Sequence, residues 1–191
     1  MKFENLTIVI STKNEKHLDM FIEQNFELLK DNILIVIDSG GGEKLRPYCS
    51  LYLNERLSFW EARKLAYKHV TTKFVLNLDS DNVPPLDYVR QAMDLLRHDK
   101  AEAVAIDYEK PLGHPAFGTS LWKIECLRQL YDFPPQNTDV AVKVGSQTWL
   151  ITSENENCEC TYMWRKLKLS GGRLETLPFR AKHLKWLCES L

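Results

Sequence analysis

The chain has 191 residues, of which 44% are hydrophobic and 27% charged, as in an ordinary soluble globular protein. A net charge of −1 without a basic block gives no argument for nucleic-acid binding, and the apolar runs are too short to cross a bilayer. The five cysteines are scattered and odd in number, which argues against a disulfide framework. We therefore expect one cytoplasmic domain, residues 1–191, with no nucleic-acid partner and no integral membrane segment.

The first half of the chain alternates apolar runs with amphipathic stretches. The apolar runs predict buried strands over residues 6–10, 33–37, 51–53 and 74–78. The amphipathic stretches predict helices over residues 17–30, 58–69 and 86–98. Ser58 and Glu61 have the spacing of a capping box, which marks the start of the second helix. Strands joined by helices form βαβ units, so this half predicts an α/β fold with a parallel sheet.

The fourth strand ends in two aspartates one residue apart, Asp79 and Asp81, before a diproline at residues 84–85. Alternate residues of an extended segment point the same way, so both carboxylates can face one point. Two such charges repel each other unless a cation lies between them, and hard oxygen ligands favour Mg²⁺ or Mn²⁺. The alternative interpretation is a plain acidic turn, because Asp, Ser and Asn are common turn residues.

The second half of the chain is less regular. Strands are expected over residues 103–106 and 173–177, and residues 140–144 are strand-like but ambiguous. Helices are expected over residues 120–131, 161–170 and 183–191. A loop rich in Gly and Pro covers residues 110–119, and we expect residues 107–119 to line one side of a binding site.

Four segments in this order resemble the family 2 type of nucleotide-sugar-dependent glycosyltransferases. They are the opening strand with Asn14-Glu15, the second-strand acid in Asp38-Ser39-Gly40, the Ala62-Arg63 helix leading into Asp79-Ser80-Asp81, and the closing Gly171, Pro178 and His183. The resemblance implies a GT-A fold, a three-layer α/β/α arrangement with a mainly parallel central sheet. It also implies that residues 1–100 bind the nucleotide sugar and residues 101–191 the acceptor.

The resemblance implies roles for residues at the strand ends, where parallel sheets bind ligands. The nucleotide-sugar donor, a UDP- or GDP-sugar, would be held by Thr12, Asn14, Glu15, Asp38, Arg63, Asp79 and Ser80. Arg63 would lie near the diphosphate, whose geometry suits a guanidinium. Asp79 and Asp81, with His183 as a third ligand, would hold Mn²⁺ or Mg²⁺ against the diphosphate and neutralise charge on the departing nucleotide.

An inverting transfer also needs a carboxylate that deprotonates the acceptor hydroxyl. The family supplies it from a Glu-Asp pair before the helix that precedes Gly171, but the corresponding residues here are Glu159 and Cys160. Glu159 is therefore the first candidate. Asp139, which follows a Pro-rich loop, is the second. The remaining acids considered are Asp107, Glu154 and Glu156.

The sequence thus predicts a metal-dependent hexosyltransferase that moves a sugar onto a hydroxyl of a glycan or of a protein- or lipid-linked acceptor, with inversion. A module that binds nucleotide or sugar without turnover is the alternative, because the sequence departs from the family at Cys160. A sugar nucleotidyltransferase fits less well, because residues 11–16 lack the glycines of its first loop. The short chain is compatible with a virus-encoded protein, for example of a thermophilic archaeal virus, which would place it in the host cytoplasm.

Overall fold

The computed structural model describes residues 1–13, 15–110, 114–132, 140–144, 147–151 and 159–185. Its strands are β1 (Leu6–Thr12), β2 (Ile33–Asp38), β3 (Leu51–Asn54), β4 (Phe74–Asp79), β5 (Asn82–Val83), β6 (Ala103–Tyr108), β7 (Leu121–Lys123), β8 (Val140–Val144), β9 (Gln147–Ile151) and β10 (Leu174–His183). Its α-helices are α1 (Leu18–Leu29), α2 (Phe59–His69), α3 (Leu86–Arg97), α4 (Ile124–Asp132) and α5 (Glu159–Leu169). Two 3₁₀ turns, η1 (Glu43–Tyr48) and η2 (Phe117–Thr119), complete the order.

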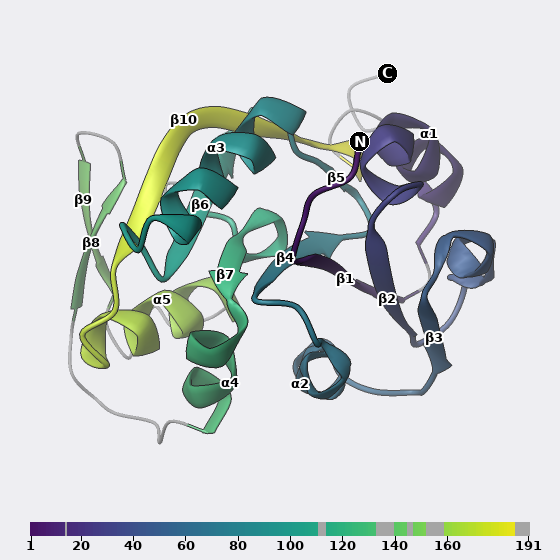
Figure 1. The fold of residues 1–191 in the computed structure, drawn as a ribbon, viewed down its shortest axis with the longest axis horizontal. Coiled ribbons are helices and arrows are strands. Elements are labelled where there is room, and N and C mark those ends of the chain that lie inside the picture. Colours follow the sequence, from purple (N-terminus) through teal and green to yellow (C-terminus); the bar gives the residue numbers. More distant parts are fainter. Residues whose placement is uncertain (14, 111–113, 133–139, 145–146, 152–158, 186–191) are drawn as a thin grey trace.

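Eight strands form one curled sheet in the order β3-β2-β1-β4-β7-β6-β10-β5 (Figure 1). Strands β1 to β4 pair in parallel, as do β6 and β10. Strand β7 lies antiparallel between β4 and β6, and β5 pairs antiparallel with β10. The sheet is therefore mixed rather than purely parallel: of the seven pairings between its described strands, four are parallel and three are antiparallel. The antiparallel strands join the two halves of the chain into a single sheet.

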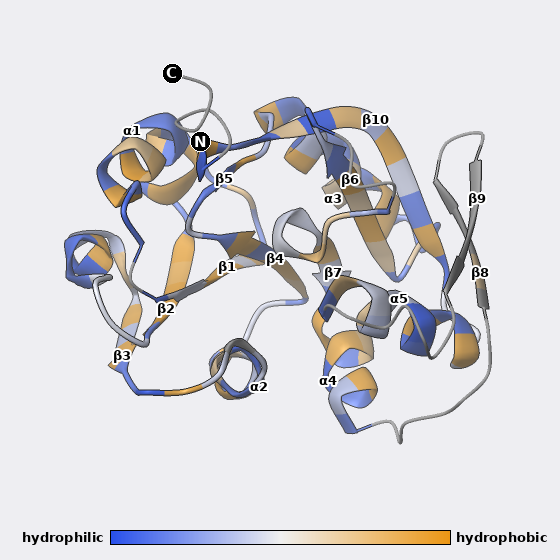
Figure 2. Cartoon of the chain, turned by 180° about the vertical axis from the view of Figure 1, so that it is seen from behind, coloured by the Kyte–Doolittle hydropathy of each residue, from blue (hydrophilic) through white to orange (hydrophobic). Residues whose placement is uncertain are grey.

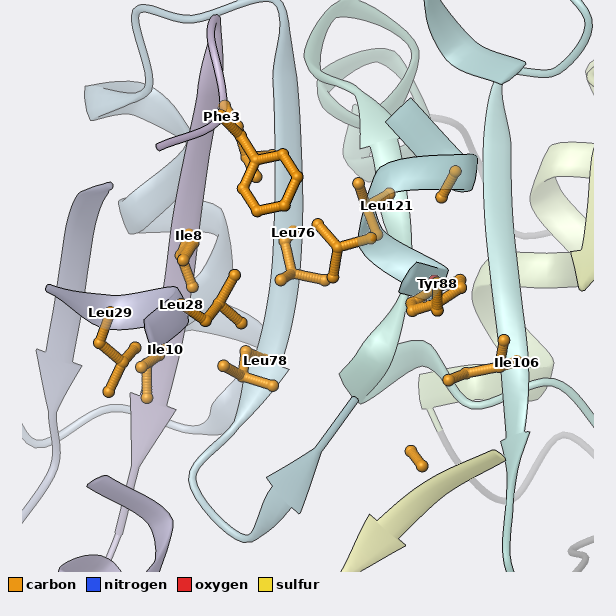
Figure 3. Packing of buried hydrophobic residues seen from close by; sticks show 14 of the residues in the cluster. Phe3, Ile8, Ile10, Leu28, Leu29, Leu76, Leu78, Tyr88, Ile106 and Leu121 are labelled. Atoms are coloured by element: carbon orange, nitrogen blue, oxygen red, sulfur yellow. The ribbon is translucent and has the colours of Figure 1, made fainter. Parts of the chain in front are cut away.

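Helices cover both faces of this sheet. One buried cluster joins apolar residues of β1, β2 and β4 to α1 and α3, and a second cluster joins the opposite faces of the strands to α2, α4 and α5. Figure 3 shows part of the first cluster, with labelled side chains from β1 and β4, from α1 and α3, and from β6 and β7. In Figure 2 the helices carry both hydrophobic and hydrophilic residues, as expected of helices that pack one side on a sheet.

Within β1 the side chains alternate between the two clusters, because successive residues of a strand point to opposite faces. Ile8 and Ile10 belong to the first cluster, whereas Val9 belongs to the second. Both faces are apolar, which explains why the strand is an almost continuous apolar run in the sequence.

Two expectations for the second half are wrong in detail. Residues 121–123 form the strand β7, so the helix expected over residues 120–131 begins only at Ile124. The strand expected over residues 173–177 runs to His183. The ambiguous segment 140–144 is a strand, β8, which pairs with β9 in a separate two-stranded sheet.

Of the helix expected over residues 183–191, only Leu184 and Lys185 are helical and described, and residues 186–191 lie outside the described part of the chain. None of the described helices is both long enough and apolar enough to span a bilayer.

Candidate functional site

A cavity of about 470 Å³ lies at the carboxyl ends of β1 and β4. Its lining residues come from both halves of the chain and are Ser11, Lys13, Glu15, Arg63, Asp79, Ser80, Asp81, Phe117, Gly118, Glu159, Cys160, His183 and Lys185. A larger hollow of about 600 Å³ lies at the other end of β4, around Phe74 and Lys123. That hollow contains none of the residues that the sequence predicts to be functional, so the cavity at the carboxyl ends is the candidate site.

Arg63 is a buried positively charged residue among those that line the cavity. The capping box of Ser58 and Glu61 starts α2, and Arg63 follows in the second turn with only 5% of its side chain exposed. Its guanidinium donates to Asp79 Oδ1 and to Glu159 Oε2, and it lies 5.0 Å from the centre of the Phe117 ring. Burial is the largest single effect and disfavours the charged form, but the negative charge of Asp79 and smaller contributions from Tyr67, Tyr131 and Cys160 together outweigh it, so the pKa of Arg63 is raised.

Asp81 and His183 form the second polar pair of the site. Strand β5 pairs with β10 so that His183 lies opposite Asn82, and the Leu184 N–H donates to the Asp81 carbonyl at 2.8 Å. This pairing leaves His183 Nε2 3.5 Å from Asp81 Oδ2. Burial raises the pKa of Asp81 to about 7, and the negative charges of Asp79 and Glu15 add to the effect.

The predicted divalent cation can be tested against these side chains. No group of three His, Cys, Asp or Glu residues comes together as a metal site anywhere in the described part of the chain. Asp81 and His183 are close enough to coordinate the same metal ion, whereas the Asp79 carboxylate forms an ion pair with Arg63. Mg²⁺ commonly takes only one or two carboxylates from a protein and completes its shell with phosphate and water oxygens. The side chains present therefore fit a cation held by Asp81 and His183.

Asp38 does not line the cavity, although it stands at the end of β2 as expected. It is fully buried, and its Oδ1 accepts hydrogen bonds from the N–H groups of Gly40 at 2.8 Å and Gly42 at 3.0 Å. The Tyr52 hydroxyl donates to its Oδ2. Gly42 has no space for a side chain, because a Cβ would lie 2.5 Å from Thr12 Cγ2. Asp38 thus organises the loop after β2.

The remaining nucleotide-binding candidates divide between the cavity and its surroundings. Glu15 and Ser80 line it, and Glu15 also accepts a hydrogen bond from the His17 N–H at 3.1 Å. Thr12 is buried beside Asp38 and lines a small neighbouring recess with Ser39. Asn14 lies outside the described residues.

Of the candidate proton acceptors, Glu159 lines the cavity as the first residue of α5. The Tyr131 hydroxyl donates to its Oε1 at 2.8 Å. Asp107 is buried at the end of β6, where it forms an ion pair with Arg180 at 3.0 Å. Asp139, Glu154 and Glu156 lie outside the described residues.

Sequence reasoning missed several lining residues. Ser11 lies opposite Asp79 in the β1–β4 register, and its hydroxyl is buried without a hydrogen-bond partner among the described residues. Gly118 comes from the Gly- and Pro-rich loop, which was expected to border the site, but its place beside Asp79 was not foreseen. The one feature of the sequence that could have indicated Ser11 is its position as a polar residue near the end of an apolar strand.

No family model matches the sequence, and no curated protein matches it. Among solved structures, the chain resembles Staphylococcus aureus TarS residues 1–349, a GT-A-like glycosyltransferase, with a TM-score of 0.58 and 15% identity over 93% of this chain and 60% of that one. The same TarS fragment in complex with UDP-GlcNAc gives a TM-score of 0.62 and 16% identity over 93% of this chain and 58% of that one. The chain has a GT-A-like fold.

A second kind of enzyme shares this architecture. The bifunctional IspDF of Campylobacter jejuni, which includes an IspD-type nucleotidyltransferase, gives a TM-score of 0.55 and 12% identity over 90% of this chain and 49% of that one. The chain thus spans about 60% of the TarS fragment and about half of IspDF. At such identities the likeness shows the fold alone, and it carries no indication of an archaeal-virus source.

Proposed function

We propose that the protein is a glycosyltransferase that takes a sugar from a nucleotide-sugar donor, with UDP as the first nucleotide to test, and passes it to an acceptor hydroxyl. One observation carries the proposal. Arg63, Asp81 and His183 meet on one cavity at the carboxyl ends of parallel strands, in a fold shared with a protein crystallised with UDP-GlcNAc.

The charges of the cavity suit a diphosphate with a cation. Arg63 supplies a buried positive charge with planar donors, and the exposed Lys13 and Lys185 stand at the cavity wall. Asp81 and His183 would hold Mn²⁺ or Mg²⁺, which when bound neutralises charge on the leaving nucleotide. The Ser11 hydroxyl, buried and unpartnered within the described residues, is a hydrogen-bonding group for the donor.

Two alternatives follow from the same geometry. A binding module would hold nucleotide and cation without releasing nucleoside diphosphate from the donor sugar. A nucleotidyltransferase is favoured by the likeness to IspDF, but the loop after β1 lacks the glycines with which that class is expected to bind a triphosphate.

The first experiment is a calorimetric titration of the wild type with UDP and with GDP, each with and without Mn²⁺. We expect one nucleotide to bind, with an affinity that depends on Mn²⁺ and is lost in Asp81→Ala. Asp94→Ala, at an exposed acid of α3, is the matched control and should bind as the wild type does. Failure of both nucleotides to bind in the presence of Mn²⁺ would overturn the proposal.

A turnover assay then separates the enzyme from the binding module. The protein is incubated with UDP-sugars and Mn²⁺, and release of free UDP is followed over time. A transferase releases UDP faster when a suitable acceptor is added, whereas a binding module releases none. Release of pyrophosphate from UTP and a sugar phosphate would instead favour the nucleotidyltransferase.

A further inference from the structure

Both oxygens of the Glu159 carboxylate are already engaged. Arg63 donates to Oε2, and the Tyr131 hydroxyl donates to Oε1 at 2.8 Å. The side chain is 18% exposed, so water screens these contacts only in part. Hydrogen bonds to a charged carboxylate favour its charged form, and a carboxylate held in this way is a weak proton acceptor. The geometry thus argues against the role that the sequence suggested for Glu159.

Tyr131 is itself fixed by packing. Its ring stacks on Trp60 with centroids 4.0 Å apart and planes at 28°, and it meets the edge of Tyr67 at 5.2 Å. Both partners belong to α2, the helix that carries Arg63. The tyrosine is only 7% exposed, and burial raises its pKa, so the hydroxyl remains a proton donor. Helices α2, α4 and α5 therefore meet around one hydrogen-bonded chain.

These contacts connect the packed aromatic rings to the charged side chains of the cavity. The aromatic group holds Tyr131, Tyr131 holds Glu159, and Glu159 holds one end of the Arg63 guanidinium while the other end contacts Asp79. A planar guanidinium bound at two edges has a defined orientation on the cavity wall. Without Glu159, Asp79 would be the one carboxylate contact that remains to orient Arg63 among the described residues.

We propose that Glu159 and Tyr131 are positioning residues that hold Arg63 in place for the donor, and that the proton acceptor of the reaction is a different group. The functional part rests on the proposed glycosyltransferase activity. The anchoring itself is a property of the protein alone, and it can be measured without any ligand.

The ligand-free test follows the Arg63 side chain by NMR in protein labelled with ¹⁵N-arginine, with Arg63→Lys to assign its signal. In the wild type we expect the Arg63 Nε–H to exchange with water at least about tenfold more slowly than that of Arg90, whose ion pair with Asp87 is exposed. Tyr131→Phe keeps the ring packing, and both it and Glu159→Ala should accelerate the exchange at Arg63. Unchanged exchange in both variants would overturn the anchoring.

Tyr162→Phe is the matched control. Tyr162 contacts the edge of the Trp60 ring, with centroids 5.1 Å apart, so the variant removes a hydroxyl from the same aromatic group. It should leave the Arg63 exchange unchanged. An equal acceleration in Tyr162→Phe and Tyr131→Phe would mean that general loosening of the aromatic group, rather than the hydrogen bond to Glu159, explains the result, and would also count against the proposal.

The functional test separates positioning from proton transfer. A positioning role predicts that Glu159→Ala and Tyr131→Phe weaken donor binding about three- to tenfold, non-additively, and that Glu159→Gln recovers part of the loss because its amide oxygen still accepts from Arg63. The pH profile of kcat should be unchanged. A proton acceptor predicts instead that Gln and Ala both lower kcat by about 10²–10⁴-fold with donor affinity unchanged, which would overturn the proposal.

Different experimental results would reject the glycosyltransferase assignment and the anchoring of Arg63. If the wild type binds neither UDP nor GDP, the glycosyltransferase assignment falls, while the exchange measurement still decides whether Glu159 and Tyr131 anchor Arg63. If donor binds but Arg63 exchange is insensitive to both variants, the assignment stands and the anchoring is wrong.

Discussion

The backbone of Gly118 lies directly against the carboxylate of Asp79. A Cβ atom at Gly118 would lie 1.8 Å from Asp79 Oδ2 and 2.3 Å from its Cγ, which no real side chain tolerates. The glycine belongs to η2, the turn that precedes β7, so a segment from the second half of the chain covers the acid at the end of β4. Absence of a side chain at Gly118 is what lets Asp79 face Arg63.

Gly118→Ala should therefore push the Asp79 carboxylate away from Arg63. We expect a loss of about 1–3 kcal/mol in the free energy of unfolding, typical of an overpacked site, measured by urea denaturation. In an Asp79→Ala background, Gly118→Ala should lower the free energy of unfolding much less, because the carboxylate with which the new methyl group would clash is absent. Equal costs in the two backgrounds would contradict the contact.

Ionisation of Asp81 should make the free energy of unfolding fall as the pH rises. Its pKa is raised from an ordinary value of 3.8 to about 7 in the folded protein by burial, by Asp79 and by Glu15, with Lys185 opposing the shift and His183 at 3.5 Å. The folded state therefore keeps a proton that the unfolded state releases, so stability falls between about pH 4 and pH 7 and stays low above it. Asp81→Asn cannot ionise and therefore removes this pH-dependent loss of stability.

The variant should melt at a higher temperature than the wild type at about pH 8 with a chelator present, and the difference should shrink at about pH 4. Mn²⁺ tests the cation site in the same experiment, because an ion that binds only the folded wild type raises its melting temperature and not that of Asp81→Asn. A wild type that gains nothing from Mn²⁺, and does not bind it in a direct titration, would argue against the cation site.

Asn82 should contribute to stability out of proportion to its size. Its side-chain amide is fully buried and donates to the Tyr108 hydroxyl at 2.9 Å and to the Gly118 carbonyl at 3.2 Å. The backbone carbonyl of Asn82 accepts from the Asn25 side-chain amide at 3.0 Å. Asn82→Ala removes both of these side-chain hydrogen bonds and should lower the free energy of unfolding by about 2–3 kcal/mol, again measured by urea denaturation.

Tyr108→Phe removes only one of these acceptors and should cost less than Asn82→Ala. If Asn82→Ala has a free energy of unfolding within experimental error of the wild type, the Asn82 amide does not hold β5 and η2 together.

Glu102 should stabilise the start of β10 in a pH-dependent way. Arg173 donates to its carboxylate from the backbone N–H at 2.7 Å, from Nε at 3.1 Å and from Nη2 at 2.7 Å. These bonds lower the pKa of Glu102 from 4.5 to about 2. The stabilisation is therefore complete above the unfolded pKa and is lost as the pH falls through about 2.

Glu102→Gln should unfold at a lower urea concentration than the wild type at about pH 7, by a small margin because Arg173 is half-exposed, and at the same concentration near pH 2. Glu125→Gln, an exposed acid of α4, is the control and should match the wild type at both values. A constant difference between Glu102→Gln and the wild type at both pH values would show that charge is not the cause.

Local patterns determined much of the first half of the fold. The apolar runs correctly predicted β1 to β4, the amphipathic stretches predicted α1 to α3, and both bonds of the capping box at Ser58 and Glu61 are present. Each of these features depends on residues within a few positions of one another, so periodicity and spacing suffice to find them. The same reasoning found the acidic turn at Asp79 and Asp81, which line the cavity.

Contacts between distant segments were decided by the tertiary structure. Strand β7 is three residues long, too short for any period to show, and it exists because β4 and β6 pair with it on either side. Asp38 stands where the sequence placed it, but backbone N–H groups of its own loop turn the carboxylate inward.

Arg63 and Glu159 are 96 positions apart, and no local pattern relates them. The sequence by itself therefore determined β1 to β4, α1 to α3 and the edge of the sheet that carries the cavity, because these follow from short-range periodicity. Which charges pair at that edge, and so what each can do, depended on packing between α2, α4 and α5, which only the folded chain provides.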